Sequence, residues 1–422
     1  MLLEFKLNNF RVFKNENIFS MYKNQSNTLK ETLIEADLFG EHFSLLPTKV
    51  IYGTNASGKS SLLIGIDLLK KILLNNTLIS DDLDNVYKNI SIYTFMHDEK
   101  KFSEPISFYI SFLNNGKYEY ELRISKDDKN LAKVEYEKLI YNNVAIFERK
   151  EKVVAYNPKK TKEFNKYISL DEAYIKMSEN LLKDNLNDTS VFTRWFNLNK
   201  KIMDDFNEYI YNKLFVYFKI KQIKVLPSIL KNDNSTKIVN EALFKMVKEA
   251  EFGPQELYFG TSDKNSNEVE LKAKYNFSKN FEVVLPSSIT ESDGTIDLIY
   301  FLFPFMNAIF TGGVLFFDEL DASLHPEVMA AIIKCFEDPS VNKLGAQLIF
   351  TTHNPVYLNK NLFRKDEIVF VEKNKYDYSS SIFTLADIEN RNDSSYLKKY
   401  LEGKYIEFVN IDFSNIMKSV MK

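Results

Sequence analysis

One eight-residue segment has the residue types and the spacing of a phosphate-binding loop. Residues 53–60 read Gly-Thr-Asn-Ala-Ser-Gly-Lys-Ser and fit the pattern G-x-x-x-x-G-K-[ST]. Glycines let the backbone turn its N–H groups toward phosphate oxygens, and a following helix start adds a partial positive charge. Lys59 can reach the β- and γ-phosphates of a nucleotide, and the Ser60 hydroxyl can bind Mg²⁺. The predicted phosphate-binding residues are Gly53, Asn55, Ala56, Ser57, Gly58, Lys59, Ser60 and Ser61.

The sequence around this segment supports the same interpretation. An apolar run at 50–52 predicts a strand before the loop, and a helical pattern follows it over 61–74. A glycine-rich turn without function is the alternative for the motif taken alone. The order strand, loop, helix favours a phosphate-binding loop.

A second acidic motif lies far downstream. Four apolar residues at 314–317 are typical of a strand buried on both faces of a parallel sheet. Asp318 and Glu319 follow this strand directly. Beside a phosphate-binding loop, Asp318 is predicted to hold Mg²⁺ through water, and Glu319 to polarise the water that attacks the γ-phosphate. A buried strand that ends in two solvated acids is the alternative.

A histidine completes the candidate constellation. His353 follows the predicted strand 348–352, at the tip of a strand next to the acidic motif. From there its ring can hydrogen-bond a γ-phosphate oxygen and report its loss, although a lone histidine is more often structural. Residues 320–326, which include Asp321, follow the acidic pair and belong to the same motif region.

The order of these segments resembles that of the ABC-type ATPase superfamily. Within it the chain is most similar to the soluble AAA15/AAA21-type group, whose ATPase heads are like those of RecF, Rad50, SMC and OLD proteins. Residues 9–13 (Asn-Phe-Arg-Val-Phe) resemble the opening of those heads. Residues 291–295 (Glu-Ser-Asp-Gly-Thr) lie where the family has its L-S-G-G-Q signature, and only Ser292 and Gly294 match it. Taken alone, this segment reads as a turn and a helix cap.

The resemblance implies an α/β fold with a mixed sheet flanked by helices, an antiparallel β subdomain and an inserted, mainly helical subdomain. It implies ATP and Mg²⁺ as ligands and a homodimer, or a higher even oligomer, whose heads sandwich two ATP molecules. Lys59 of one subunit would touch a γ-phosphate together with Ser292 and Gly294 of the other, and Asp321 would couple the two sites. The family's Q-loop glutamine is missing, and His97 is a weak substitute for it.

Three regions are predicted along the chain. Residues 1–156 form the first part of the head, including a β-hairpin at 106–124 that turns at Asn114-Asn115-Gly116. Residues 157–252 form a helical insertion, and 253–422 form the second part of the head. The insertion is predicted from one apolar helix face and from a further helix over 236–252. That face comprises Ile202, Met203, Phe206, Tyr209, Ile210 and Leu214.

Composition excludes several classes of protein. The 422 residues are 45% hydrophobic and 14% aromatic, enough to fill a sizeable core. A net charge of −3 gives no global footprint for nucleic acid. The single cysteine, Cys335, excludes an internal disulfide and a cysteine-based zinc cluster, consistent with a reducing cytoplasm. The apolar run 296–317 is interrupted by Asp297, Pro304 and Gly312-Gly313, so we expect a buried helix, a turn and a strand. With no signal peptide evident, we expect a cytoplasmic protein without a membrane partner.

Our preferred functional hypothesis is a dimeric ATPase switch of a bacterial anti-phage, abortive-infection system. Too few residues follow His353 for a Toprim domain, so we expect a separate effector chain, either a nuclease, a Toprim-type protein or a toxin. A nucleic acid or a phage protein would be the trigger. The family analogy carries this role, and the residues do not.

Three other hypotheses remain. A RecF- or Rad50-like DNA-repair ATPase needs a basic track with stacking aromatics. A transporter subunit is disfavoured by the degenerate signature and the missing glutamine. A protein that binds ATP without turnover is disfavoured by the acidic pair. The candidate DNA-binding residues are Lys213, Lys219, Lys221, Lys224, Tyr217 and Phe218.

Overall fold

The computed structural model describes most of the two head regions and part of the segment between them. The described residues are 1–26, 28–38, 40–78, 93–127, 131–167, 175–177, 179–180, 200–220, 223, 241, 243–245, 248–249, 253–262, 269–278, 281–322, 324–388, 395–408 and 412–421.

A six-stranded sheet lies at the centre, in the order β11-β15-β16-β5-β17-β18. The first five strands are parallel, and β18 pairs antiparallel with β17. The strands are β5 (Thr48–Tyr52), β11 (Leu214–Tyr217), β15 (Val314–Phe317), β16 (Gln347–Thr351), β17 (Ile368–Lys373) and β18 (Ser380–Thr384). The buried strand predicted at 314–317 is confirmed, because β15 has these bounds and has a neighbour on each side.

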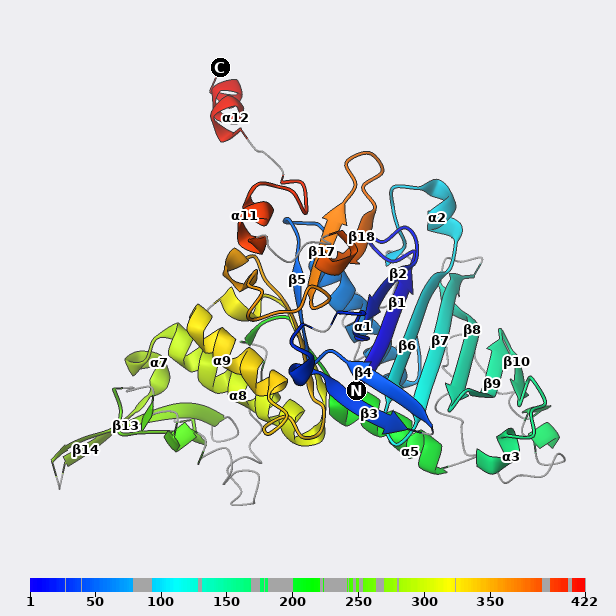
Figure 1. Ribbon diagram of the computed structural model, residues 1–422, viewed down its shortest axis with the longest axis horizontal. Coiled ribbons are helices and arrows are strands. Elements are labelled where there is room, and N and C mark those ends of the chain that lie inside the picture. Colours follow the sequence, from blue (N-terminus) through cyan, green and yellow to red (C-terminus); the bar gives the residue numbers. More distant parts are fainter. Residues whose placement is uncertain are drawn as a thin grey trace.

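Apolar strands are needed here because the sheet is covered on both faces. In β5, Ile51 packs on the side of helix α1 (Lys59–Asn75). Val50 and Tyr52 face the opposite side, in the core that includes α8 (Asp293–Thr311) and α9 (Pro326–Glu337). Figure 1 shows α8 and α9 on one flank of this sheet and α1 on the other.

A seven-stranded antiparallel sheet packs against the other side of α1, so that this helix lies between two sheets. Its order is β10-β9-β8-β7-β6-β1-β2. The strands are β1 (Leu2–Asn8), β2 (Asn17–Ser20), β6 (Ile106–Leu113), β7 (Lys117–Lys126), β8 (Ala132–Tyr141), β9 (Val144–Lys150) and β10 (Val153–Tyr156). The predicted hairpin is confirmed as β6 and β7. The α/β fold expected from the sequence, with a mixed sheet flanked by helices and an antiparallel β subdomain, is thus confirmed.

Smaller elements complete the described chain. A three-stranded sheet, β12-β13-β14, leads into α7 and α8, and β3 pairs with β4. These strands are β3 (Ile34–Leu38), β4 (Glu41–Leu45), β12 (Glu256–Thr261), β13 (Val269–Ser278) and β14 (Phe281–Pro286). The remaining helices are α2 (Glu99–Ser103), α3 (Phe164–Tyr167), α5 (Lys200–Glu208), α7 (Ser287–Thr290), α10 (Leu385–Ile388), α11 (Tyr396–Leu401) and α12 (Phe413–Val420). Short helical turns are η1 (Lys30–Thr32), η4 (Tyr209–Lys213), η7 (Leu320–Ala322) and η8 (Pro355–Tyr357).

The helical pattern expected across 157–252 is wrong at Leu214. Its apolar face is buried as far as Ile210 and packs on the seven-stranded sheet, for example through Phe206 against Phe112. Leu214 then begins β11, which pairs in parallel with β15. Part of the expected insertion therefore belongs to the central sheet. The helix expected over 236–252 falls mostly outside the described residues, of which 241, 243–245 and 248–249 are helical.

Within the described chain, α8 alone is long and apolar enough to cross a membrane. Its side chains Phe301, Ala308 and Ile309 nevertheless pack in the core beside the central sheet. The helix ends at Gly312, whose φ of 64° suits a left-handed cap, and β15 follows. The helix, turn and strand expected for 296–317 are confirmed.

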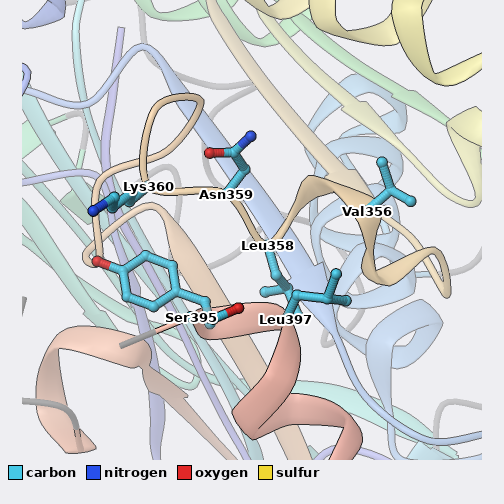
Figure 2. A pocket seen from close by; sticks show the side chains of 7 residues that line it. Val356, Leu358, Asn359, Lys360, Ser395 and Leu397 are labelled. Carbon is cyan, nitrogen blue, oxygen red and sulfur yellow. The ribbon is translucent and has the colours of Figure 1, made fainter. Parts of the chain in front are cut away.

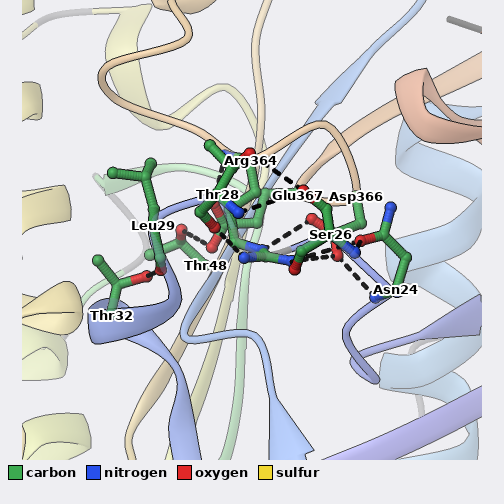
Figure 3. A network of polar contacts seen from close by, with 9 residues as sticks. All are labelled: Asn24, Ser26, Thr28, Leu29, Thr32, Thr48, Arg364, Asp366 and Glu367. Carbon is green, nitrogen blue, oxygen red and sulfur yellow. Dashed lines mark hydrogen bonds and ion pairs between the residues drawn. The ribbon is translucent and has the colours of Figure 1, made fainter. Parts of the chain in front are cut away.

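A buried polar network ties the start of β17 to the N-terminal segment (Figure 3). Arg364 is 1% exposed and binds Asp366 through Nε (2.9 Å) and Nη2 (3.0 Å). The oxygens of the Glu367 carboxyl group accept bonds from the Arg364 N–H (2.8 Å) and the Thr48 hydroxyl (3.0 Å). Burial raises the pKa of Glu367 to about 8.

This shifted pKa predicts a pH-dependent stability. Folded Glu367 holds a proton that the unfolded chain releases between about pH 4.5 and 8, so stability falls as pH rises through that window. Glu367→Gln is expected to gain stability relative to the wild type over the same range, on the order of a few kcal/mol at pH 8. Thermal unfolding of both proteins at pH 5 and pH 8 measures this, with the exposed Glu31→Gln as control. An equal difference at both pH values would contradict the prediction.

Candidate active site

The loop between β5 and α1 has the backbone geometry of a phosphate cradle. A Cβ atom on Gly53 would lie 2.3 Å from Ser57 Oγ and 2.5 Å from the Val371 carbonyl, so only glycine fits. Gly58 caps α1 with a φ of 118°, and Ala56 also has a positive φ, of 60°. The loop therefore turns tightly and directs its backbone to the N-terminus of a 17-residue helix, where anions bind favourably.

The Lys59 side chain is held close to the backbone of the loop. The Lys59 ammonium donates to the carbonyls of Gly53 (2.8 Å) and Thr54 (3.3 Å). Burial lowers the pKa of Lys59, while the charges of Asp318 and Glu319 act in the opposite direction. These acids are therefore near Lys59 in space. Ser57 Oγ is buried without a hydrogen-bond partner among the described residues, and the Ser57 carbonyl accepts from Ser380 Oγ at 2.5 Å.

The acidic pair reaches the same edge of the sheet. Strand β16 separates β15 from β5, and the carboxyl ends of these parallel strands align. Asp318 is 9% exposed, and its Oδ1 accepts from the Thr351 hydroxyl at 2.6 Å. Glu319 has a left-handed φ of 51°, and its N–H donates to the same hydroxyl at 2.8 Å. The Glu319 carboxylate is exposed.

His353 lies beside this carboxylate. Its Nε2 is 3.8 Å from Glu319 Oε1. Partial burial, followed by the charge of Lys59, lowers the pKa of His353. The imidazole is therefore mostly neutral at neutral pH, with one N–H free to donate and one nitrogen free to accept.

Most of the predicted residues line one cleft of about 560 Å³. Gly53, which begins the loop, and Asp318, which precedes Glu319, are not part of its lining. Sequence reasoning did not assign Arg11, Val12 or Lys373 to the site, although residues 9–13 had been noted for their resemblance. Lys373 carries no motif signal, because it simply ends β17. The full lining comprises Arg11, Val12, Asn55, Ala56, Ser57, Gly58, Lys59, Ser60, Ser61, Glu319, His353 and Lys373.

The cleft suits a nucleoside triphosphate with a divalent cation. The tight turn at Gly53 and the helix start at Lys59 leave room for phosphate oxygens and offer N–H groups to them. Arg11, Lys59 and Lys373 add positive charge to the lining. A hydroxyl at Ser60 and a carboxylate at Asp318 are hard oxygen donors of the kind that Mg²⁺ takes beside substrate phosphates.

The signature-like residues lie outside this cleft. Ser292 is exposed and caps α8, where its Oγ accepts from the Thr295 N–H at 3.2 Å. The predicted helix cap is confirmed. Figure 1 shows α7, which leads into α8, on the side of the molecule away from α1. Neither Ser292 nor Gly294 lines the cleft of its own chain.

Asp321 and His97 also lie outside the cleft lining. Asp321 Oδ2 accepts from the Thr352 hydroxyl at 2.7 Å, and burial raises the pKa of this carboxyl. The His97 ring packs against Tyr378, with ring centroids 4.8 Å apart, and against Phe95. His97 is thus engaged in an aromatic cluster and does not line the cleft.

The basic track considered for DNA is not supported where the structure describes it. Lys213 donates to Asn114 Oδ1 (2.9 Å) and lies 3.5 Å from Glu208. Tyr217 belongs to β11 and stacks on Phe317, and Phe218 packs against the core. Lys221 and Lys224 lie outside the described residues. Lys213, Tyr217 and Phe218 therefore have contacts within the fold, and Lys219 is the exposed residue among the described members of this set.

A second hollow, of about 430 Å³, lies between the segment after His353 and α11 (Figure 2). It contains none of the predicted site residues. Its lining residues are Val356, Leu358, Asn359, Lys360, Ser395, Tyr396 and Leu397. With one cation and no acid in its lining, it lacks the groups for phosphate chemistry that the first cleft combines.

The fold and the site together define an ABC-type ATPase with a phosphate-binding loop. A family model described as "AAA domain, putative AbiEii toxin, Type IV TA system" matches residues 50–359, and the chain belongs to this family. Among solved structures, the chain is similar to an SMC head domain from Thermotoga maritima, with 12% identity and a TM-score of 0.41. It is also similar to the recombination mediator protein RecF, with 12% identity and a TM-score of 0.37. Each comparison covers 91% of this chain and 98% of the other. No curated protein matches.

Proposed function

We propose that this chain is a Mg²⁺-dependent ATPase. The observation that carries the proposal is the convergence of Lys59, Glu319 and His353, from three distant segments, on one cleft. The loop N–H groups and Lys59 bind the phosphates. Ser60 and Asp318 would hold Mg²⁺, which would neutralise charge on the phosphate oxygens. Glu319 draws a proton from the attacking water, and His353 hydrogen-bonds the γ-phosphate.

The functional unit in this proposal is a homodimer, or a higher even oligomer, closed around two ATP molecules. Ser292 is exposed at the start of a 19-residue helix, outside its own cleft. The exposed N-terminus of a long helix is suited to a phosphate supplied by another molecule. Ser292 and Gly294 of one copy thus complete the site of the other, and Asp321 couples the two sites.

The biological role in this proposal is an anti-phage switch of the abortive-infection type in the cytoplasm. The description of the family as a putative toxin of a toxin–antitoxin system supports that context. ATP-driven closure of the heads controls a separate effector, and a nucleic acid or a phage protein is the trigger. The region 157–252, between the two parts of the head, supplies the surface for the trigger or the effector. Phage plating on cells that carry this gene with its neighbours tests the role, and Lys59→Ala is expected to restore plaques.

Purified protein tests the ATPase directly. The wild type is expected to release phosphate from ATP with Mg²⁺ and to stop when EDTA removes the metal. Lys59→Ala is expected to lose at least tenfold in ATP affinity, because a buried cation beside the phosphates is removed. Lys334→Ala, an exposed lysine of α9, is the control. A wild type without Mg²⁺-dependent turnover, or a Lys59→Ala variant with normal turnover, would contradict the proposal.

A further inference from the structure

One threonine hydroxyl contacts both members of the acidic pair. Thr351 is the last residue of β16, two positions before His353, and it is fully buried. Its Oγ1 donates to Asp318 Oδ1 at 2.6 Å and accepts the Glu319 N–H at 2.8 Å. A hydroxyl has one proton to give and lone pairs to accept with, so both bonds form at once.

These two bonds constrain the two acids in different ways. Glu319 has a φ of 51°, a left-handed conformation that costs about 1 kcal/mol or more for a residue with a side chain. The bond from its N–H to Thr351 opposes that cost. At Asp318 the bond occupies Oδ1 and fixes the plane of the carboxylate, so that Oδ2 has no hydrogen-bond partner among the described residues. A short bond from a hydroxyl to an ionised carboxylate is of the stronger kind.

We propose that Thr351 is the positioning residue of the acidic pair. It orients the Asp318 carboxylate toward the metal, and it holds Glu319 in the conformation that aims its side chain into the cleft. The inference rests on the proposed ATPase function. Thr351 does not line the cleft, so it acts through Asp318 and Glu319. Partners of this kind, one step removed from a metal, typically cost 10–100-fold in metal affinity or activity when they are removed.

The adjacent Thr352 provides a matched control. It is equally buried, and its Oγ1 donates to Asp321 at 2.7 Å and accepts the Asn354 N–H at 2.8 Å. The two threonines thus have the same chemistry and burial, but only Thr351 contacts the acidic pair. Loss of a buried threonine hydroxyl, at the end of β16 or directly after it, is common to both variants, so any difference between them reflects the acids that they hold.

The experiment compares Thr351→Ala with Thr351→Ser, which differ by the hydroxyl oxygen alone, and adds Thr352→Ala. Binding of a fluorescent ATP analogue is measured first in EDTA and then at increasing concentrations of free Mg²⁺. Turnover of ATP is measured separately. Thr351→Ala is expected to bind the analogue normally in EDTA, to need about 10-fold more Mg²⁺ for its metal-dependent binding, and to lose about 10–100-fold in kcat. Thr351→Ser is expected to stay within about threefold of the wild type, and Thr352→Ala to keep its Mg²⁺ dependence.

The outcomes separate this inference from the proposed function. If the wild type shows neither Mg²⁺-dependent binding nor turnover, the proposed ATPase function fails. If the wild type is active and Thr351→Ala has the same Mg²⁺ dependence and kcat as the wild type, only the positioning role is overturned. If Thr351→Ser is as impaired as Thr351→Ala, the methyl group rather than the hydroxyl matters, which also overturns it. If Thr351→Ala does not fold, Thr351→Val, which keeps the shape of threonine, replaces it in the comparison.

Discussion

Glu319→Gln is expected to reduce ATP turnover by about 10²–10⁴-fold, the usual contribution of a general base, while ATP binding persists. Glutamine keeps the size of the side chain and the N–H that bonds Thr351, so the strand end should keep its geometry. It removes only the carboxylate that takes a proton from water. Because hydrolysis then fails after binding, the variant should also accumulate in the ATP-bound, paired state. Phosphate release and size-exclusion chromatography with ATP measure the two effects.

Glu327→Gln is the control for this variant. Glu327 lies eight positions further on, in the first turn of α9, and it is exposed and does not line the cleft. It should turn over ATP at the wild-type rate. Should Glu319→Gln keep the wild-type rate as well, another group must activate the water, and the role given to Glu319 is wrong.

The parts of the site that sequence could predict are those whose chemistry is written in consecutive residues. The loop at 53–60 and the strand at 314–317 each combine a backbone requirement with a functional side chain. At Gly53, for example, any side chain would collide with Ser57 and Val371. Such segments carry their own structural context, because an apolar strand must precede each set of polar groups. Their meeting on one edge follows from parallel strand order.

Contacts between distant segments could not be predicted in this way. Thr351 looks like any residue of an apolar strand until β16 is placed beside β15, when its hydroxyl meets Asp318. Arg11 and Lys373 enter the cleft from the segment after β1 and from the end of β17. The resemblance at residues 9–13 does not by itself place Arg11 in the cleft, and no local pattern marks Lys373. The strand β11 was missed because Leu214 continues the helical spacing of the preceding apolar residues. Pairing with β15, a tertiary contact, decides its conformation.

The pairing of heads predicts a large effect at a residue that lies outside its own cleft. Ser292→Asp is expected to lower ATP turnover by about 100-fold. The N-terminus of α8 should receive the γ-phosphate bound by the other copy, and a carboxylate at this position would repel that phosphate. Aspartate is as good an N-cap as serine, so α8 should remain folded. Ser395→Asp is the matched control, since Ser395 is an exposed N-cap of α11 that accepts from the Lys398 N–H at 3.3 Å. It should leave turnover unchanged.

Mixing variants tests whether Ser292 acts on the partner's nucleotide. Ser292→Asp and Lys59→Ala should each be nearly inactive alone. A mixed dimer has one site in which an intact Lys59 faces an intact Ser292, because the two residues of a site come from different copies. ATP turnover should therefore return when the two proteins are combined. Light scattering should show that the mixed proteins form dimers in the presence of ATP. If Ser292 served the cleft of its own chain, each subunit of the mixture would still carry one defective residue at its own site, and no activity would return. Full turnover by Ser292→Asp alone would contradict any contact between this helix end and ATP.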